Sequence, residues 1–205
     1  MKYLDCNKIN DLINQQIEEK NEVEFLNFKD CKEENLEYNK IEISNCKFTK
    51  CICTNSKFIG TYFYKTIFEN CDFSNSDFSQ SDFTNCQFNN CKFIGCKFLN
   101  SSFYKINIYD SNFEYSNFCE SIFKENRIND SNFSYSELGE CKIQKSVFNE
   151  VNLYNAYLFK TSLNNVDLST SNIEKIIIGI NDLKGLTVND MQALELSKLL
   201  GIKIK

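Results

Sequence analysis

The stretch CDFSNSDFSQSDFTNCQFNNCKFIGCKF, residues 71–98, decides the fold. Within it a phenylalanine recurs at every fifth residue: Phe73, Phe78, Phe83, Phe88, Phe93 and Phe98. A step of five matches neither the helical period nor the strand period. All of these rings can point to one axis only if the chain turns a corner inside each pentad. The pattern therefore predicts a solenoid built from short stacked sides.

The five-residue register extends far beyond this stretch. All but Phe25 and Phe159 of the 19 phenylalanines occupy it, and it is unbroken from Ile41 to Leu183. After Phe133 the central residue becomes mostly aliphatic. A longer spacing of 20 residues is superimposed on the register, and it relates Cys31, Cys51, Cys71 and Cys91, and also Asn112, Asn132, Asn152 and Asn172. This longer spacing indicates a coil of four pentads.

The composition excludes several classes of protein. The 205 residues suit one domain and contain no histidine, the commonest general base and metal ligand, so we expect neither an enzyme nor a metal or cofactor site. The net charge of −5 argues against direct binding of nucleic acid. The first residues lack an apolar signal region and no window is long enough to span a membrane. We therefore expect a soluble, cytoplasmic protein that makes no membrane contact.

The 11 cysteines do not follow the pattern of a disulfide scaffold. Eight of them stand two residues before the central residue of a pentad, where serine, threonine, alanine or valine stands elsewhere: Cys31, Cys46, Cys51, Cys71, Cys86, Cys91, Cys96 and Cys141. We interpret them as reduced, small buried hydrophobes. Cys53 occupies a central position and Cys119 an outward one, and the sequence leaves the reactivity of both open.

The triplets CDF, SDF, SNF, VNL and VDL resemble the motif of the pentapeptide-repeat family, A(D/N)(L/F)xx, from about Ile41 to Ile180. The resemblance implies an all-β fold, a right-handed quadrilateral parallel β-helix with short terminal helices. Without proline and with 6 glycines, the corners need Asn, Asp or Ser in their turns. We divide the chain into an N-terminal helix and irregular cap (1–40), the β-helix (41–185) and a C-terminal helix with a dimerisation tail (186–205).

We expect the segments at both ends of the chain to cover the ends of the solenoid. Apolar residues at helical spacing, Ile9, Leu12, Ile13 and Ile17, predict a helix from about Asp5 to Lys20. The segment from Asp30 to Asn39 breaks the pattern by placing Glu33 at a central position, so we expect a loop or a distorted coil there. Near the C-terminus, Asn189 and Gln192 form a predicted capping box, Gly201 a helix stop, and 202–204 alternates like a short strand.

The run Gln192-Ala193, Leu196 and Leu200-Gly201-Ile202 resembles the C-terminal helix of the Qnr and MfpA quinolone-resistance group. That resemblance implies a homodimer through the C-terminus and binding to DNA gyrase or topoisomerase IV by imitation of duplex DNA, with protection from fluoroquinolones in several members. Many Qnr proteins carry two projecting loops, which the unbroken register leaves no room for. The expected dimer interface comprises Leu183, Leu186, Met191, Leu194, Leu196, Leu199, Leu200 and Ile202.

Acidic residues are concentrated late in the rod. The segment from Asp110 to Glu140 contains seven acidic residues but only two basic ones, Lys124 and Arg127. The 20-residue coil stacks the acids into two columns: Asp110, Asp130 and Glu150 in one, and Glu120 and Glu140 half a coil away. Repeated carboxylates repel one another unless a cationic surface faces them. We therefore predict that these five residues bind the partner.

Two alternatives stay open at this point. After topoisomerase binding, which we prefer, the second interpretation is a structural or scaffold protein that binds an unidentified protein partner. The outward aromatic residues Tyr115, Tyr135, Tyr154, Tyr157 and Phe159 are consistent with either interpretation. The sequence contains no nucleophile beside a base and no phosphate-binding loop, so an enzyme is the remote alternative.

Overall fold

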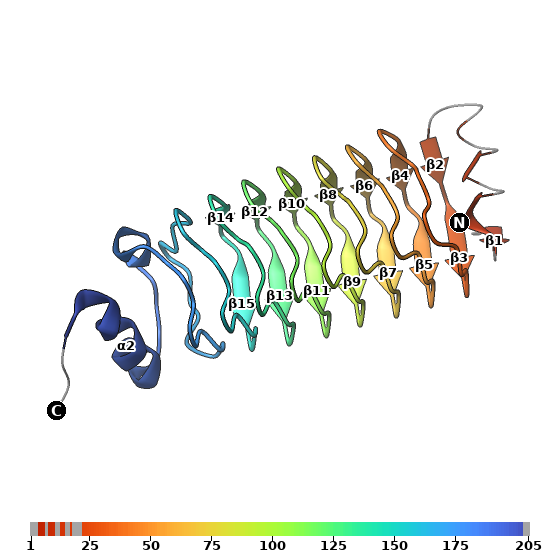
Figure 1. Ribbon diagram of the computed structural model, residues 1–205. Coiled ribbons are helices and arrows are strands. Elements are labelled where there is room, and N and C mark those ends of the chain that lie inside the picture. The colour runs from red at the N-terminus through yellow and green to blue at the C-terminus, as the bar shows by residue number, and fades with distance from the viewer. Residues whose placement is uncertain (1–3, 7, 11–12, 15–16, 18–21, 203–205) are drawn as a thin grey trace.

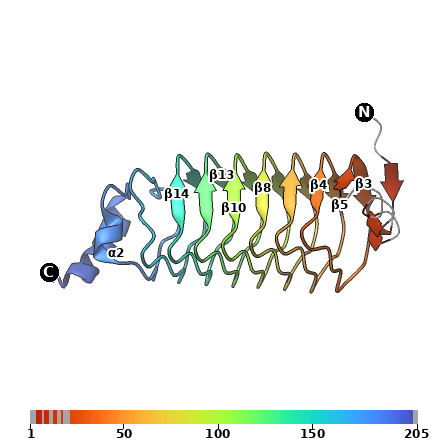
Figure 2. The ribbon, with the colours of Figure 1, turned by 90° about the horizontal axis from the view of Figure 1, so that it is seen from above.

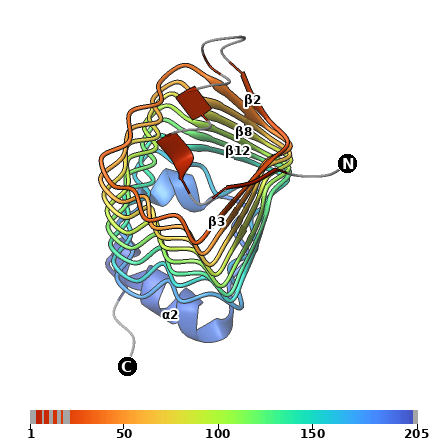
Figure 3. The same ribbon diagram turned by 90° about the vertical axis from the view of Figure 1, so that its right-hand side faces the viewer.

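The computed structural model describes residues 4–6, 8–10, 13–14, 17 and 22–202. These residues form a solenoid whose coils stack along one axis, with strand β1 at one end and helix α2 at the other (Figure 1). The coils remain side by side when the rod is seen from above (Figure 2). Along the axis each coil shows a four-sided outline (Figure 3). The predicted fold class, a quadrilateral parallel β-helix with a short helix near the C-terminus, is confirmed.

Two of the four sides are continuous parallel sheets, which we name by their strand numbers. The odd sheet has eight strands: β1 (Leu4–Cys6), β3 (Leu26–Lys29), β5 (Lys47–Thr49), β7 (Ile67–Glu69), β9 (Gln87–Asn89), β11 (Asn107–Tyr109), β13 (Arg127–Asn129) and β15 (Val147–Asn149). The even sheet has seven: β2 (Glu22–Glu24), β4 (Glu42–Ser44), β6 (Tyr62–Tyr64), β8 (Asp82–Thr84), β10 (Ser102–Tyr104), β12 (Ile122–Lys124) and β14 (Lys142–Gln144).

The other two sides are held by isolated parallel bridges. On the third side the bridges run from Lys32↔Ile52 to Asn152↔Asn172, and on the fourth side from Glu37↔Lys57 to Tyr157↔Ile177. Every one of these bridges, like the sheet pairs from β2 onward, joins residues 20 apart. The 20-residue coil predicted from the cysteine and asparagine spacing is thus correct.

The corners explain how the chain turns with so few glycines. The last residue of nearly every pentad has a positive φ, for example 55° at Asn55 and 61° at Asn75. Asn and Asp tolerate this left-handed conformation best among side-chain-bearing residues, and they occupy many corners as predicted. Lys, Glu, Gln, Tyr, Phe and Gly occupy the others, and no serine stands at a left-handed corner of the described chain. The stacking energy of the coils therefore outweighs local preference at these corners.

Phenylalanine rings fill the axis. Rings one coil apart lie parallel, such as Phe73 and Phe93 with centroids 5.5 Å apart and an interplanar angle of 6°. Neighbouring sides of one coil meet edge to face, as Phe88 and Phe93 do at 5.2 Å and 89°. Both geometries are favourable for aromatic pairs, and the rings are almost completely buried.

The small inward position carries hydrogen bonds as well as packing. Its hydroxyl or thiol donates to the carbonyl of the central residue in the preceding coil, as Ser76 Oγ does to Cys53 (3.1 Å) and Cys96 Sγ does to Phe73 (3.0 Å). The hydroxyl also accepts the N–H of the residue 20 positions earlier, as between Ser76 and Ser56 (3.0 Å). The cysteines are therefore buried as predicted, but they also act as donors, which explains their exchange with serine and threonine.

Residues 9–10, 13–14 and 17 at the N-terminal end are helical. Ile9 and Ile13 are buried against the first coils, whereas Leu12 lies outside the described residues. The predicted helix starts too early, because Asp5 lies in strand β1, which pairs with β3. Parallel pairing also already begins with β2 at Glu22, inside the segment assigned to the cap.

Glu33 has a structural reason for its central position. Its carboxylate accepts hydrogen bonds from the backbone N–H of Ile9 and from that of Asn10 (3.1 Å). A carboxylate at the start of a helix satisfies free N–H groups and complements the helix dipole. Of the two expectations for 30–39, the loop is wrong, because Lys32 and Glu37 bridge to the following coil, and the segment is a coil.

The C-terminal end is closed by a 3-10 turn, η1 (Ile180–Leu183), by α2 (Asp190–Ser197) and by η2 (Lys198–Leu200). The predicted capping box of Asn189 and Gln192 is present. The Gln192 amide also donates to the carbonyls of Leu168 (2.9 Å) and Ser171 (2.6 Å) in the last coil. Gly201 ends the segment with φ of 70°, and the predicted strand over 202–204 falls largely outside the described residues.

One interruption was not predicted. Among the described residues, no backbone hydrogen bond or bridge joins β14 or β15 to the coil that follows, 161–170. The third and fourth sides of these same coils stay paired, through Asn152↔Asn172 and Tyr157↔Ile177. The sequence register does not reveal this opening, because each coil still contains 20 residues.

Candidate protein-binding surfaces

The first predicted acidic column lies on the corner between the odd sheet and the third side. Asp110, Asp130 and Glu150 all take the left-handed corner conformation, with φ of 48°, 49° and 52°. Corner side chains point away from the axis, and none of the three forms an ion pair within the described chain. The structure therefore brings these three carboxylates together as a column open to solvent, with Asp130 the most shielded.

Outside this column, the same corner carries one further acid, Asp30, and otherwise neutral or basic residues. Lys50 and Asn70 occupy it toward the N-terminus, and the Asn90 amide donates to Asn70 Oδ1 (2.7 Å). Thr170 follows the column and its hydroxyl accepts the N–H of Glu150 (3.2 Å). Successive acids on this corner thus occur in three coils toward the C-terminal end of the rod, and Asp30 stands apart at the other end.

The second predicted column lies on the diagonally opposite corner, between the fourth side and the even sheet. Glu120 is exposed there, but Glu140 forms an ion pair with Lys160 in the next coil (2.9 Å). The structure therefore does not bring the two columns onto one surface, and it partly neutralises the second. The column of Asp110, Asp130 and Glu150 is the stronger candidate for contact with a cationic partner.

A basic corner separates the two sheets. It carries Lys65, Lys105 and Lys145, and the ammonium groups of Lys65 and Lys105 lie over the rings of Tyr64 (4.9 Å) and Tyr104 (5.0 Å). Glu125 offers a counter-charge to Lys105 at 3.9 Å. Although the net charge of the chain is modest, two adjacent corners of the rod carry charge of opposite sign.

Exposed tyrosines stack along the corner between the third and fourth sides. The rings of Tyr115 and Tyr135 lie 5.1 Å apart, Tyr154 meets Tyr135 edge to face at 5.6 Å, and Lys175 lies over Tyr154 at 4.9 Å. Beside them a ladder of asparagine amides joins Asn112, Asn132, Asn152 and Asn172 by hydrogen bonds of 3.0–3.1 Å. The asparagine repeat noticed in the sequence is therefore an ordered surface feature.

A second aromatic group lies on the fourth side. Tyr157 and Phe159 are exposed with centroids 6.2 Å apart, and Ile177 stands beside Tyr157 in the next coil. Gly139 leaves room for the Tyr157 ring, since a Cβ there would lie 3.0 Å from it. These exposed apolar groups suit a protein contact.

The predicted dimer residues divide into two sets. Leu183, Leu186 and Leu196 are half-buried against the core, whereas the exposed set comprises Met191, Leu194, Leu199, Leu200 and Ile202. A groove between η1 and α2 is lined by Leu183, Leu186, Leu196 and Leu200 of these sets, together with Ile180 and Val188. The apolar end of the rod is therefore only partly covered by its own helix.

The described cysteine side chains are buried except Cys119, which is half-buried. Burial raises the pKa of the Cys86 thiol to about 12. Partial burial and then the nearby carboxylates of Glu137 and Glu120 raise the pKa of Cys119 as well. Cys53 is completely buried on the axis, and burial raises its pKa strongly.

We expect Cys119 to be the site of thiol alkylation in the folded protein. In a Cys6→Ser background, which removes a cysteine whose side chain is not described, iodoacetamide should modify one thiol. Because the pKa of Cys119 is raised, the rate should increase with pH through a midpoint above that of a free thiol. Peptide mass mapping checks the site, and modification of a core cysteine at the same rate would contradict the burial pattern.

Other kinds of site receive no support. Within the residues described, no group of three or more His, Cys, Asp or Glu side chains is arranged to hold a metal ion. Likewise, no helix of that part of the chain combines the length and the apolar character needed to cross a bilayer.

Comparisons with known proteins identify the repeats. A family model described as "Pentapeptide repeat region" matches residues 24–92, and one described as "Pentapeptide repeats (8 copies)" matches residues 136–174. No curated protein sequence matches significantly.

Solved structures of repeat proteins also align with the chain. Trypsin-treated variants of QnrB1, a plasmid-mediated fluoroquinolone resistance protein, align at 21% identity over 88% of this chain and 90% of that one (TM-score 0.47), and at 20% identity over 100% of both (TM-score 0.48). HetL from Nostoc sp. strain PCC 7120, described as involved in heterocyst differentiation regulation, aligns at 10% identity over 88% of this chain and 94% of that one (TM-score 0.36).

Proposed function

Since the chain belongs to the pentapeptide-repeat family, we propose that it is a non-catalytic binding protein whose rod imitates duplex DNA and occupies a type II topoisomerase. The partner would be DNA gyrase or topoisomerase IV. The observation that carries the proposal is the open column of Asp110, Asp130 and Glu150 on one corner of the rod.

The spacing of this column supports the proposal. Paired strands lie about 4.8 Å apart, so three successive coils hold three carboxylates over about 10 Å. Each strand of duplex DNA carries one phosphate per about 3.4 Å of axis. The column thus presents a line of negative charge at a comparable spacing, and its backbone is held in place by the coils above and below.

The acidic column should act by electrostatic complementarity. Carboxylates without a partner on their own chain are available to lysines and arginines of a surface that normally binds DNA. Added salt should weaken the complex, because it screens contacts between exposed charges. The basic corner is separated from the acidic column by the odd sheet. Only one orientation of the rod would therefore present the acidic column to a DNA-binding surface.

A supercoiling assay with purified gyrase tests the proposal. At micromolar concentration the full chain should inhibit supercoiling or relieve inhibition by ciprofloxacin, and the effect should decrease as salt is raised. Protection and inhibition are both consistent with binding, and the assay distinguishes them. A chain that does neither to gyrase or to topoisomerase IV would contradict the proposal.

The apolar C-terminal end supports a homodimer as part of this function. A two-fold contact there would join two rods end to end and so lengthen the DNA-like surface. The exposed side chains of Met191, Leu194 and Leu200 supply an apolar patch that a second copy would bury. The groove between η1 and α2 lies at the same end.

We expect full-length chain to sediment as a dimer at micromolar concentration. The double substitution Leu194→Asp and Leu200→Asp should yield a monomer, because it places two charges in the contact. Thr187→Asp is a matched control, since Thr187 is exposed near the same end but outside the apolar patch. Analytical ultracentrifugation measures the oligomeric state. If the parent chain is a monomer, the dimer proposal is wrong and the C-terminal helix only covers the last coil.

The exposed aromatic residues favour a second candidate, a scaffold that binds another protein partner. The stacked Tyr115 and Tyr135 and the apolar pair Tyr157 and Phe159 need no DNA-like partner. Loss of partner binding on replacing these rings, with no dependence on the acidic column, would favour the scaffold.

A further inference from the structure

The interruption after β14 leaves the outer edge of that strand without a partner. On its inner edge the usual bonds are present, from Lys142 N–H to Ser121 (2.9 Å) and from Glu125 N–H to Gln144 (2.9 Å). On its outer edge the N–H groups of Ile143 and Lys145 find no backbone acceptor within the described residues.

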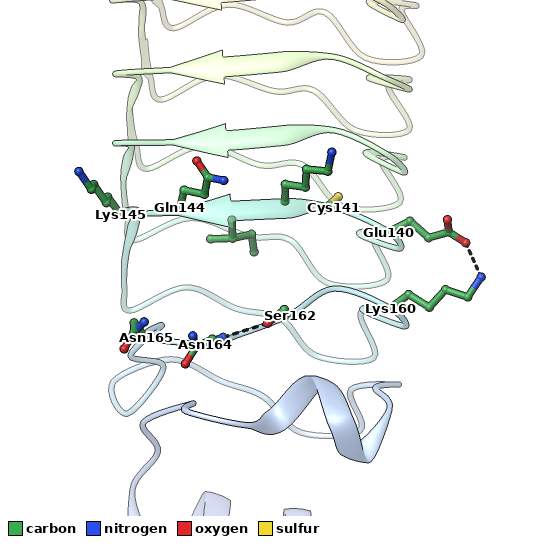
Figure 4. A pocket seen from close by; sticks show the side chains of 10 residues that line it. Glu140, Cys141, Gln144, Lys145, Lys160, Ser162, Asn164 and Asn165 are labelled. Carbon is green, nitrogen blue, oxygen red and sulfur yellow. Dashed lines mark hydrogen bonds and ion pairs between the residues drawn. The ribbon is translucent and has the colours of Figure 1, made fainter.

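The next coil keeps the usual bonds to the coil that follows it. Leu163 donates to Asp182 (3.0 Å) and Asn165 to Gly185 (3.1 Å), so residues 162–165 are held from the C-terminal side. Figure 4 shows the resulting separation between β14 and the segment that carries Ser162, Asn164 and Asn165. Both walls of the separation are held by backbone hydrogen bonds, β14 to the coil before it and residues 163 and 165 to the coil after them.

This separation is a cleft of about 670 Å³. Its volume lies within the usual range of ligand sites, about 300–1,000 Å³. Ile143 lies on its wall and is only half-buried, whereas the equivalent Phe123 one coil earlier is 1% exposed. The cleft thus offers an apolar surface beside a free strand edge.

The charge around the cleft is positive. Lys142 and Lys145 are exposed on its rim, and neither forms an ion pair within the described part of the chain. Lys160 stands at the far end and is paired with Glu140 (2.9 Å), as Figure 4 shows. The ammonium groups of Lys142 and Lys145 are therefore available to bind a negatively charged ligand.

We propose that this cleft binds an extended, acidic peptide segment of another protein, which adds to the even sheet as a strand beside β14. The backbone of such a peptide would accept the N–H groups of Ile143 and Lys145, as in other cases of strand addition. Its carboxylates would meet Lys142 and Lys145, and an alternate apolar side chain would cover Ile143. Nucleic acid offers the charge but lacks the alternating donors and acceptors of a strand.

The site is independent of the acidic column, which lies on another corner of the rod. A failure of topoisomerase binding would therefore leave this proposal standing, and the reverse also holds. The two surfaces would allow the rod to hold a cationic partner and an acidic one at once.

Fluorescence anisotropy with a defined probe tests the proposal. The probe is a fluorescein-labelled octapeptide of alternating Asp and Val, and we expect saturable binding with a Kd of about 100 μM or tighter. Lys142→Glu with Lys145→Glu should weaken binding at least about tenfold. Lys65→Glu with Lys105→Glu, on the same corner but away from the cleft, should change it less than about twofold.

A second probe isolates the contribution of the backbone. The same octapeptide with every backbone nitrogen methylated keeps its charge but has no N–H to donate on either edge, so it should bind at least about tenfold more weakly. Hydrogen exchange at Ile143 and Lys145 should slow when the unmethylated peptide is bound.

Three results would overturn the proposal. Absence of binding would leave the lysines the role of protecting a strand edge from aggregation. Equal binding of both peptides, with loss in the charge variant, would indicate an anion site without strand pairing. Tighter binding of a labelled 12-nucleotide single-stranded DNA, with the same dependence on Lys142 and Lys145, would indicate a polyanion surface.

Discussion

Phe93→Ala should lower the free energy of unfolding by about 3–5 kcal/mol. The Phe93 ring is completely buried and stacks on Phe73 and on Phe113, at 5.5 Å and 5.0 Å. Removing it leaves a cavity that rings fixed in neighbouring coils cannot fill. The edge-to-face contact with Phe88 and the tilted contact with Phe98 would also be lost. Chemical denaturation followed by circular dichroism measures the change.

Lys92→Ala is the matched control for this substitution. Lys92 is exposed in the same pentad, and its side chain takes no part in the core. Its loss should change stability by less than about 0.5 kcal/mol. Because stability in a solenoid is shared between neighbouring coils, the Phe93 variant should also unfold first in its own region. Equal effects of the two substitutions would contradict the inward and outward assignment.

Reversing the acidic column should abolish any effect on gyrase supercoiling. For the triple variant Asp110→Lys, Asp130→Lys and Glu150→Lys, we expect the effective concentration to rise at least about 100-fold, equivalent to about 2.8 kcal/mol. Three repulsive contacts would replace three attractive ones on a cationic surface. The fold should tolerate the change, since lysine already takes the left-handed corner conformation, including at Lys50 on the same corner.

Two controls separate charge from folding. Asn70→Lys with Asn90→Lys adds positive charge to the same corner without removing an acid, and it should have a much smaller effect. Replacing the three acids with Asn, Asn and Gln should give an intermediate result. If the triple variant has the circular dichroism spectrum of the parent and acts on gyrase as the parent does, the column is not the contact surface.

Sequence reasoning located the acidic column because stacking follows directly from residue number. In a 20-residue coil, residues such as Asp110 and Asp130 must lie above one another whatever the rest of the fold does. It overestimated the second column, since the ion pair of Glu140 with Lys160 depends on the rotamers of two long side chains. It also treated Glu33 as a defect, because a helix end that needs a carboxylate has no signature at that distance in the chain.

The sequence by itself determined the axis, the coil length and which side chains face inward. These follow from a strict repeat, since each pentad buries its apolar residue only if every pentad turns alike. The tertiary structure alone decided where the coils stay bonded to one another. The opening beside β14 depends on whether backbone groups about 20 residues apart meet. The N–H groups of Ile143 and Lys145 reach no backbone acceptor in 161–165, while Leu163 and Asn165 keep the usual bonds to the coil that follows. Whether two successive backbones come within hydrogen-bonding distance depends on how the coils pack, which a register of side chains does not encode.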